Sequence, residues 1–174
     1  MDARAFDFVT PKTFRTNIIE SVGFVAYLWV LAQQIEEKYR DEMARTVILY
    51  NISIVEALLL FWAKKHKIKF LEDKYTEKYV LPKNLQGIPD KELLVAHCCK
   101  IEKPDARIWL HDLVSEGKQL LGSDLHSEII DLQDIRNTFH LSKTRRTLSL
   151  DRAEDSFDVV LEVVNKIKKD ITKA

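Results

Sequence analysis

The sequence is poor in the residues that interrupt regular structure, with only four glycines and four prolines among 174 residues. Because glycine and proline are the least favourable residues inside a helix, their scarcity favours long, uninterrupted helices. Hydrophobic residues make up 46% and charged residues 31% of the chain, which is typical of a globular protein. A chain of this length fits one domain with a substantial core, so we expect a single helical domain over residues 1–174.

Cysteine is nearly absent, and the only two, Cys98 and Cys99, are neighbours in the sequence. Adjacent cysteines seldom bridge to each other, so we expect reduced thiols and a cytoplasmic setting. His97 precedes them, but the group lacks the spaced ligand pairs of a metal site. We therefore expect no metal and no cofactor, and we interpret both cysteines as buried residues of a helix.

The chain also lacks net charge and a long apolar run. Its 27 basic and 27 acidic residues cancel, so any contact with nucleic acid must come from local patches. The first residues carry no apolar core of the signal-peptide type. The longest apolar run, residues 22–32, is well short of the ~20 residues that span a bilayer. We expect no membrane contact.

Apolar residues recur at helical spacing in four long stretches. Thr10 and Pro11 are typical of a helix start, with Thr10 as the N-cap and Pro11 at the first helical position. Asp151 and Glu154 form an acceptable capping pair for the last helix. These patterns predict helices at about residues 10–39, 41–65, 124–141 and 152–172.

Residues 68–81 change character, because aromatic and charged residues alternate weakly there. This pattern predicts a short hairpin or an irregular insertion, and Pro82, Gly87 and Pro89 then mark a loop. The expected fold is all-α, a bundle of four to five main helices with this insertion around residues 68–89. Two shorter helices are expected after it, from Asp90 to about Lys100 and from Pro104 to about Glu116.

The first long helix is apolar almost all round its middle. Such a helix either lies at the centre of the fold or also faces a partner subunit. A symmetric dimer is the commonest way to bury an excess of apolar surface. We therefore expect a homodimer.

Arg136 and His140 stand out late in the helix predicted at 124–141. At about 100° per residue, Arg136 falls roughly 20° and His140 roughly 60° from the apolar residue Leu125. The two side chains thus share the inward side, one turn apart. An inward arginine needs an anion or other acceptors, so the pair is either a functional site or a structural polar cluster.

A histidine and an arginine together suit one reaction in particular. Histidine transfers protons near neutral pH, and arginine binds phosphate and offsets developing negative charge. RNA carries its own nucleophile, the 2′-hydroxyl, so a base and a group that stabilises charge can suffice without a metal. Attack on the adjacent phosphate leaves a 2′,3′-cyclic phosphate and a 5′-hydroxyl.

Two further groups are candidates for this site. The basic run Lys143, Arg145 and Arg146 follows His140 closely, and it is either solvated surface or a contact for RNA phosphates. Glu56 lies one step from the apolar stripe of the second helix, so it is either half buried beside a cation or a solvated edge residue.

The stretch Asp134–Leu141 (DIRNTFHL), placed between a long helical pair and a final amphipathic helix, resembles the HEPN superfamily. The resemblance implies an all-α bundle that dimerises, and many members are metal-independent endoribonucleases of toxin–antitoxin, phage-defence or RNA-processing systems. By position, Arg136 would contact the scissile phosphate and His140 would be the catalytic acid or base. Asn137 would help to hold the site, and Glu56 would orient Arg136.

The chain departs from the family motif in one respect, since only three residues separate Arg136 from His140, where the family usually has a longer gap. Two functions follow as hypotheses. The first is a metal-independent endoribonuclease with a composite Arg/His site. The second is a non-catalytic RNA- or protein-binding module, such as the regulatory partner of an antitoxin or nucleotidyltransferase in a two-component system.

Overall fold

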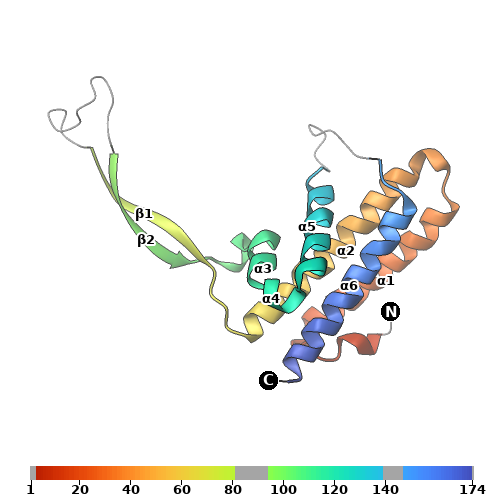
Figure 1. The fold of residues 1–174 in the computed structure, drawn as a ribbon, viewed down its shortest axis with the longest axis horizontal. Coiled ribbons are helices and arrows are strands. Elements are labelled where there is room, and N and C mark those ends of the chain that lie inside the picture. The colour runs from red at the N-terminus through yellow and green to blue at the C-terminus, as the bar shows by residue number, and fades with distance from the viewer. Residues whose placement is uncertain (1–2, 81–93, 139–146, 174) are drawn as a thin grey trace. The chain divides into compact units, whose positions relative to one another are not determined.

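The computed structural model describes residues 3–80, 94–138 and 147–173. The chain divides into two compact units: a helical unit, Met1–Ile68 with Trp109–Ala174, and a smaller unit, Lys69–Ile108. Helices make up the first unit, and a two-stranded sheet is the main element of the second (Figure 1). The expected all-α class with a small hairpin insertion is confirmed.

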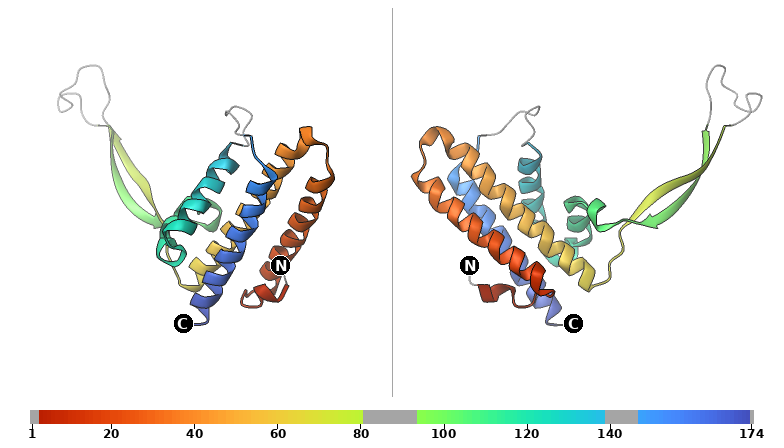
Figure 2. Two further views of the ribbon diagram at one scale, coloured as in Figure 1. Left: turned by 45° about the vertical axis from the view of Figure 1, so that its right-hand side comes forward. Right: turned by 180° about the vertical axis from the view of Figure 1, so that it is seen from behind.

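The helical unit is a bundle built around one central helix, α2, which packs against α1, α5 and α6 (Figure 2). The apolar stripes of the three outer helices all face α2, because each outer helix can bury only one side. The helical elements are η1 (Ala3–Phe6), α1 (Lys12–Gln34), α2 (Glu37–Lys65), α3 (Leu110–Glu116), α4 (Lys118–Leu121), α5 (Ser123–Asn137) and α6 (Leu150–Ile171).

Helix α2 is apolar on most of its circumference through the middle of its length. Among the described residues, it is the one helix long and apolar enough to cross a membrane. However, 61% of that apolar stretch is buried inside the bundle, as it is in the core helix of a globular protein. Length and apolar composition are therefore weak evidence for a membrane span here.

Several predicted helix ends are wrong. The first helix ends at Gln34, and Ile35 and Glu36 turn the chain in an extended conformation before α2 begins at Glu37. No glycine or proline marks this turn, so the apolar pattern runs on through it. At the other end Pro11 itself, and not Thr10, is the N-cap of α1, and no side-chain hydrogen bond caps this end. Ser149, and not Asp151, caps α6 by accepting a hydrogen bond from the Arg152 backbone N–H.

The insertion is a hairpin longer than expected. Strand β1 (Leu71–Val80) pairs antiparallel with β2 (Leu94–Glu102), and Tyr75 lies opposite Cys98. The helix predicted from Asp90 to Lys100, with buried cysteines, is wrong: Cys98 is exposed on the strand, and both thiols are free. Pairing with β1 overrides the local helical preference of Leu, Ala, Lys and Glu in this segment.

The segment after β2 also differs from the prediction. Instead of one helix from Pro104 to Glu116, a short 3-10 helix, η3 (Asp105–Arg107), closes the hairpin unit, and α3 starts separately at Leu110. The Arg107 guanidinium pairs with Glu72 at the base of the hairpin. The Lys103 N–H donates to the Phe70 carbonyl at 2.8 Å, which extends the backbone pairing beyond the strands.

A buried hydrogen bond joins α2 to α6. Asn51 Nδ2 donates to Ser156 Oγ at 2.8 Å, and the two residues are 2% and 0% exposed. Ser156 in turn donates its hydroxyl proton to the Ala153 carbonyl. Because a buried polar group without a partner costs free energy, this pair fixes the register of the two helices.

We expect Ser156→Ala to lower the free energy of unfolding by about 1–3 kcal/mol, because it leaves the Asn51 amide without its acceptor. Urea unfolding measures the change. Ser53→Ala is the matched control, since Ser53 is exposed and bonds only within α2, so its effect should stay within about 0.5 kcal/mol. Equal effects of the two substitutions would show that the buried bond contributes nothing.

Candidate functional site

The last turn of α5 brings Arg136 against α2. Arg136 Nη1 lies 2.9 Å from Glu56 Oε2, and the two side chains are 35% and 27% exposed. Helices α2 and α5 run in opposite directions (Figure 1), and side chains lean toward the N-terminus of their own helix. The two side chains meet between the helices. The structure thus places Glu56 beside Arg136.

The Arg136–Glu56 pair is only partly buried, and this limits what it contributes to stability. Exposed ion pairs typically contribute about 0–1 kcal/mol, so the fold does not depend strongly on this one. Arginine has five N–H donors in a planar fork, and one of them, on Nη1, bonds to Glu56. The pair therefore holds the guanidinium in a fixed direction and leaves part of it accessible to an anion.

The other predicted site residues divide into two groups. Asn137 is exposed at the C-terminus of α5, next to Arg136. His140 and the basic residues Lys143, Arg145 and Arg146 lie outside the described residues. The structure thus brings together Arg136 and Glu56, places Asn137 on the surface directly after Arg136, and does not test the positions of the rest.

The predicted end of the motif helix at Leu141 is wrong, because α5 ends at Asn137. Thr138 is the C-cap: its N–H bonds to the Asp134 and Ile135 carbonyls, and its hydroxyl donates to the Ile135 carbonyl at 2.7 Å. His140 lies outside the described residues, so its position on the same face as Arg136 stays a prediction.

A second ion pair, which the sequence reasoning missed, lies at the same end of the bundle. Arg45 is 1% exposed, and its Nε lies 3.0 Å from Asp41 Oδ2. Arg45 Nη1 also donates to Thr138 Oγ1 at 3.3 Å, and Asp41 Oδ1 accepts from the Leu148 N–H. The Asp41–Arg45 pair therefore fastens the chain on both sides of residues 139–147, the segment that carries the rest of the motif.

Two signals in the sequence point to this pair. Asp41 and Arg45 have the i, i+4 spacing of a helical ion pair, and Arg45 falls on the same face as the buried residues Ile48 and Ile52. An arginine on such a face must be paired. Within the described part of the chain, Arg45 Nη2 is a buried nitrogen with no hydrogen-bond partner, so this side chain keeps an unused donor.

A third arginine holds α5 against α6. Arg152 Nη2 lies 2.9 Å from Glu128 and 2.7 Å from Asp131, and Nη1 lies 3.6 Å from Asp155. Burial by itself lowers the pKa of Arg152, but the hydrogen bonds and charges of Asp131 and Glu128 outweigh it and raise the pKa. The guanidinium therefore stays charged, and it fixes the helix that presents Arg136.

No protein-family model, curated protein or solved structure matches the chain. The likeness to the HEPN superfamily therefore rests on residues 134–141 and on the order of the helices. Over the ranges that the structure describes, no group of three or more His, Cys, Asp or Glu side chains is placed to hold a metal ion. The candidate site is thus an arginine oriented by a carboxylate, at the end of a helix that two further arginines hold in place.

We expect Asp41→Ala to lower the free energy of unfolding by about 2–4 kcal/mol, because it leaves Arg45 buried and partly unpaired. Asp41→Asn keeps a hydrogen-bond acceptor and should cost less. Glu162→Ala is the matched control, since Glu162 forms a pair with Lys166 of the same i, i+4 spacing on the surface of α6. Its effect should stay within about 0.5 kcal/mol. Chemical denaturation measures how much each of the three variants lowers the free energy of unfolding. Equal losses for Asp41→Ala and Glu162→Ala would contradict the prediction.

Proposed function

We propose that the protein is a metal-independent endoribonuclease in which Arg136 contacts the scissile phosphate. The Arg136–Glu56 pair is the observation that carries the proposal. A planar guanidinium that a carboxylate holds at one nitrogen can offer its other donors to two phosphate oxygens. Because its direction is fixed before the substrate binds, little reorganisation is needed as negative charge develops. The resemblance to the HEPN superfamily supports the same function, in a toxin, phage-defence or RNA-processing context.

The proposed reaction uses the ribose 2′-hydroxyl as nucleophile. A base removes its proton, the 2′-oxygen forms a bond to the adjacent phosphorus, and the bond from phosphorus to the 5′-oxygen breaks. An acid then gives a proton to the departing 5′-oxygen. Arg136 offsets the charge on the phosphoryl oxygens, and His140 is proposed as the acid or base. Glu56 and Asn137 would hold Arg136 and the site in place.

Exposed apolar side chains on α1 support a dimeric form. Phe24, Tyr27 and Val30 recur every three residues along one side of α1, and all three are exposed. Gly23, on the same side, has no heavy atom within 4 Å of where a Cβ would stand. A second copy of the chain could cover this α1 face around a two-fold axis. Two copies would supply two arginines and two histidines, which is enough for both an acid and a base.

We expect the purified protein to cleave RNA in excess EDTA and to leave 2′,3′-cyclic phosphate and 5′-hydroxyl ends. Arg136→Ala should lower kcat by about 10²–10³, because it removes a donor to the charged transition state. Glu56→Gln should cause a smaller loss, because the arginine remains but is less firmly oriented. Arg15→Ala is the matched control, since Arg15 of α1 is exposed to about the same degree as Arg136 and pairs with Asp7, which precedes the helix.

The same cleavage assay can also contradict the ribonuclease proposal. Loss of cleavage on chelation, or 3′-hydroxyl products, would refute the proposed chemistry. An Arg136→Ala variant as active as Arg15→Ala would show that the site is assigned wrongly. RNA binding that depends on Arg136 without any cleavage would favour the non-catalytic binding module.

We expect light scattering at micromolar concentration to report about twice the chain mass of 20.3 kDa. Tyr27→Arg should shift the protein to the monomer, because it places a charge in the proposed apolar interface. Leu161→Arg is the matched control, since Leu161 is an exposed apolar residue on α6. A wild-type monomer, or equal dissociation by both substitutions, would rule out the α1 face.

A further inference from the structure

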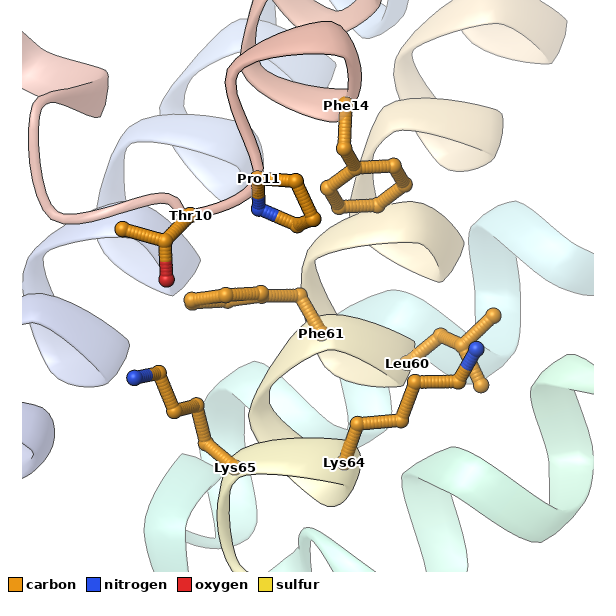
Figure 3. A pocket seen from close by; sticks show the side chains of 7 residues that line it. All are labelled: Thr10, Pro11, Phe14, Leu60, Phe61, Lys64 and Lys65. Carbon is orange, nitrogen blue, oxygen red and sulfur yellow. The ribbon is translucent and has the colours of Figure 1, made fainter.

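The start of α1 and the last turns of α2 line a cavity of about 330 Å³ (Figure 3). Small-molecule sites usually begin at about 300 Å³, so the space suits a ligand of modest size. The cavity lies within the helical unit and away from Arg136. At about 100° per residue, Phe61 in its wall points about 140° away from Glu56 around α2. The lining residues are Thr10, Pro11, Phe14, Leu60, Phe61, Lys64 and Lys65.

The walls of the cavity are apolar and rigid. The rings of Phe14 and Phe61 stack with centroids 6.2 Å apart and planes 29° apart, and Pro11 lies over the same side of Phe61 (Figure 3). Phe61 is itself largely buried. Aromatic and proline rings have few rotatable bonds, so the walls lose little conformational entropy when a ligand enters. The cavity is therefore preformed for an apolar group.

The polar groups of the cavity carry one sign of charge. The side chains of Lys64 and Lys65 extend from α2 on either side of Phe61, and Thr10 adds a hydroxyl near the Lys65 end (Figure 3). None of the lining residues that the structure describes is acidic. The first turn of α1 likewise contains no acidic residue that would oppose an anion.

A simpler explanation accounts for only part of this arrangement. Lysines are favourable at a helix C-terminus because they interact with the helix dipole. That effect requires cations in the last turn of α2, but it does not require an apolar cavity between them. The combination of a ring-lined space and two ammonium groups on either side matches an apolar body with an anionic head.

We propose that this cavity binds a small amphipathic anion, an aromatic or acyl body that carries one sulfonate, carboxylate or phosphate group. The body packs against Phe61 and Pro11, and the head group lies at the Lys65 end of the cavity, near the Thr10 hydroxyl (Figure 3). The proposal rests on the cavity and its charges, and it is independent of ribonuclease activity.

Calorimetric titration with naphthalene-2-sulfonate tests the site directly. We expect this probe to bind at least tenfold more tightly than 2-naphthol, which has the same rings without the charge. Sulfate, which has the charge without the rings, should not bind measurably. Octanoate and octanol repeat the comparison with an acyl body, and the tighter of the two anions identifies the preferred body. Equal affinity for the charged and neutral members of both pairs, or no binding at millimolar probe, overturns the proposal.

Variants locate the binding site. The double substitution Lys64→Gln with Lys65→Gln should weaken naphthalene-2-sulfonate at least tenfold and leave 2-naphthol unchanged. The matched control is Lys12→Gln with Lys118→Gln, two exposed lysines that do not line the cavity. Equal weakening by the two pairs overturns the site. Arg136→Ala should bind the probe as the wild type does, so failure of the ribonuclease proposal and failure of this one give different results.

Discussion

The burial of α2 is the constraint on which the rest of the bundle depends. This helix packs against α1, α5 and α6, so each polar side chain on its inner surface must find a partner on a neighbouring helix. Asn51 finds Ser156 on α6, while Arg45 and Glu56 find Thr138 and Arg136 at the end of α5. The position of the candidate site is therefore set by the polar requirements of α2.

The two arginines at this end of the bundle differ in burial, and the difference decides their roles. Removing the partner of a buried charge typically costs about 3–5 kcal/mol, whereas an exposed pair contributes about 0–1 kcal/mol. Arg45, which is fully buried, belongs to the first class and holds the fold. Arg136, about one-third exposed, lies closer to the second class. Its charge is thus available to a ligand without loss of stability to the bundle.

Apolar periodicity predicted the existence of the long helices correctly, because α1, α5 and α6 each bury one apolar stripe against α2. It failed where tertiary contacts decide the structure. The turn at Ile35 has no glycine or proline, and Leu94–Glu102 becomes a strand only because β1 pairs with it. For the site, spacing and family likeness singled out Arg136 and Glu56. The Asp41–Arg45 pair was visible as an i, i+4 spacing, but its contacts with Thr138 and Leu148 depend on the packing of α5 and on the start of α6.

Helix α2 carries both the ion pair with Arg136 and the cavity at its C-terminus, which raises the question of coupling between them. A ligand shifts an equilibrium only by the difference between its affinities for two states. Residues 37–65 form one continuous helix, and its middle is packed on several sides, so it provides no second arrangement for a ligand to select. An anion in the cavity would stabilise the folded bundle by mass action. At anion concentrations above Kd, this stabilisation grows with the logarithm of the concentration. The same stabilisation would leave the geometry of Arg136 unchanged, because Glu56 and Phe61 lie on different sides of a rigid helix.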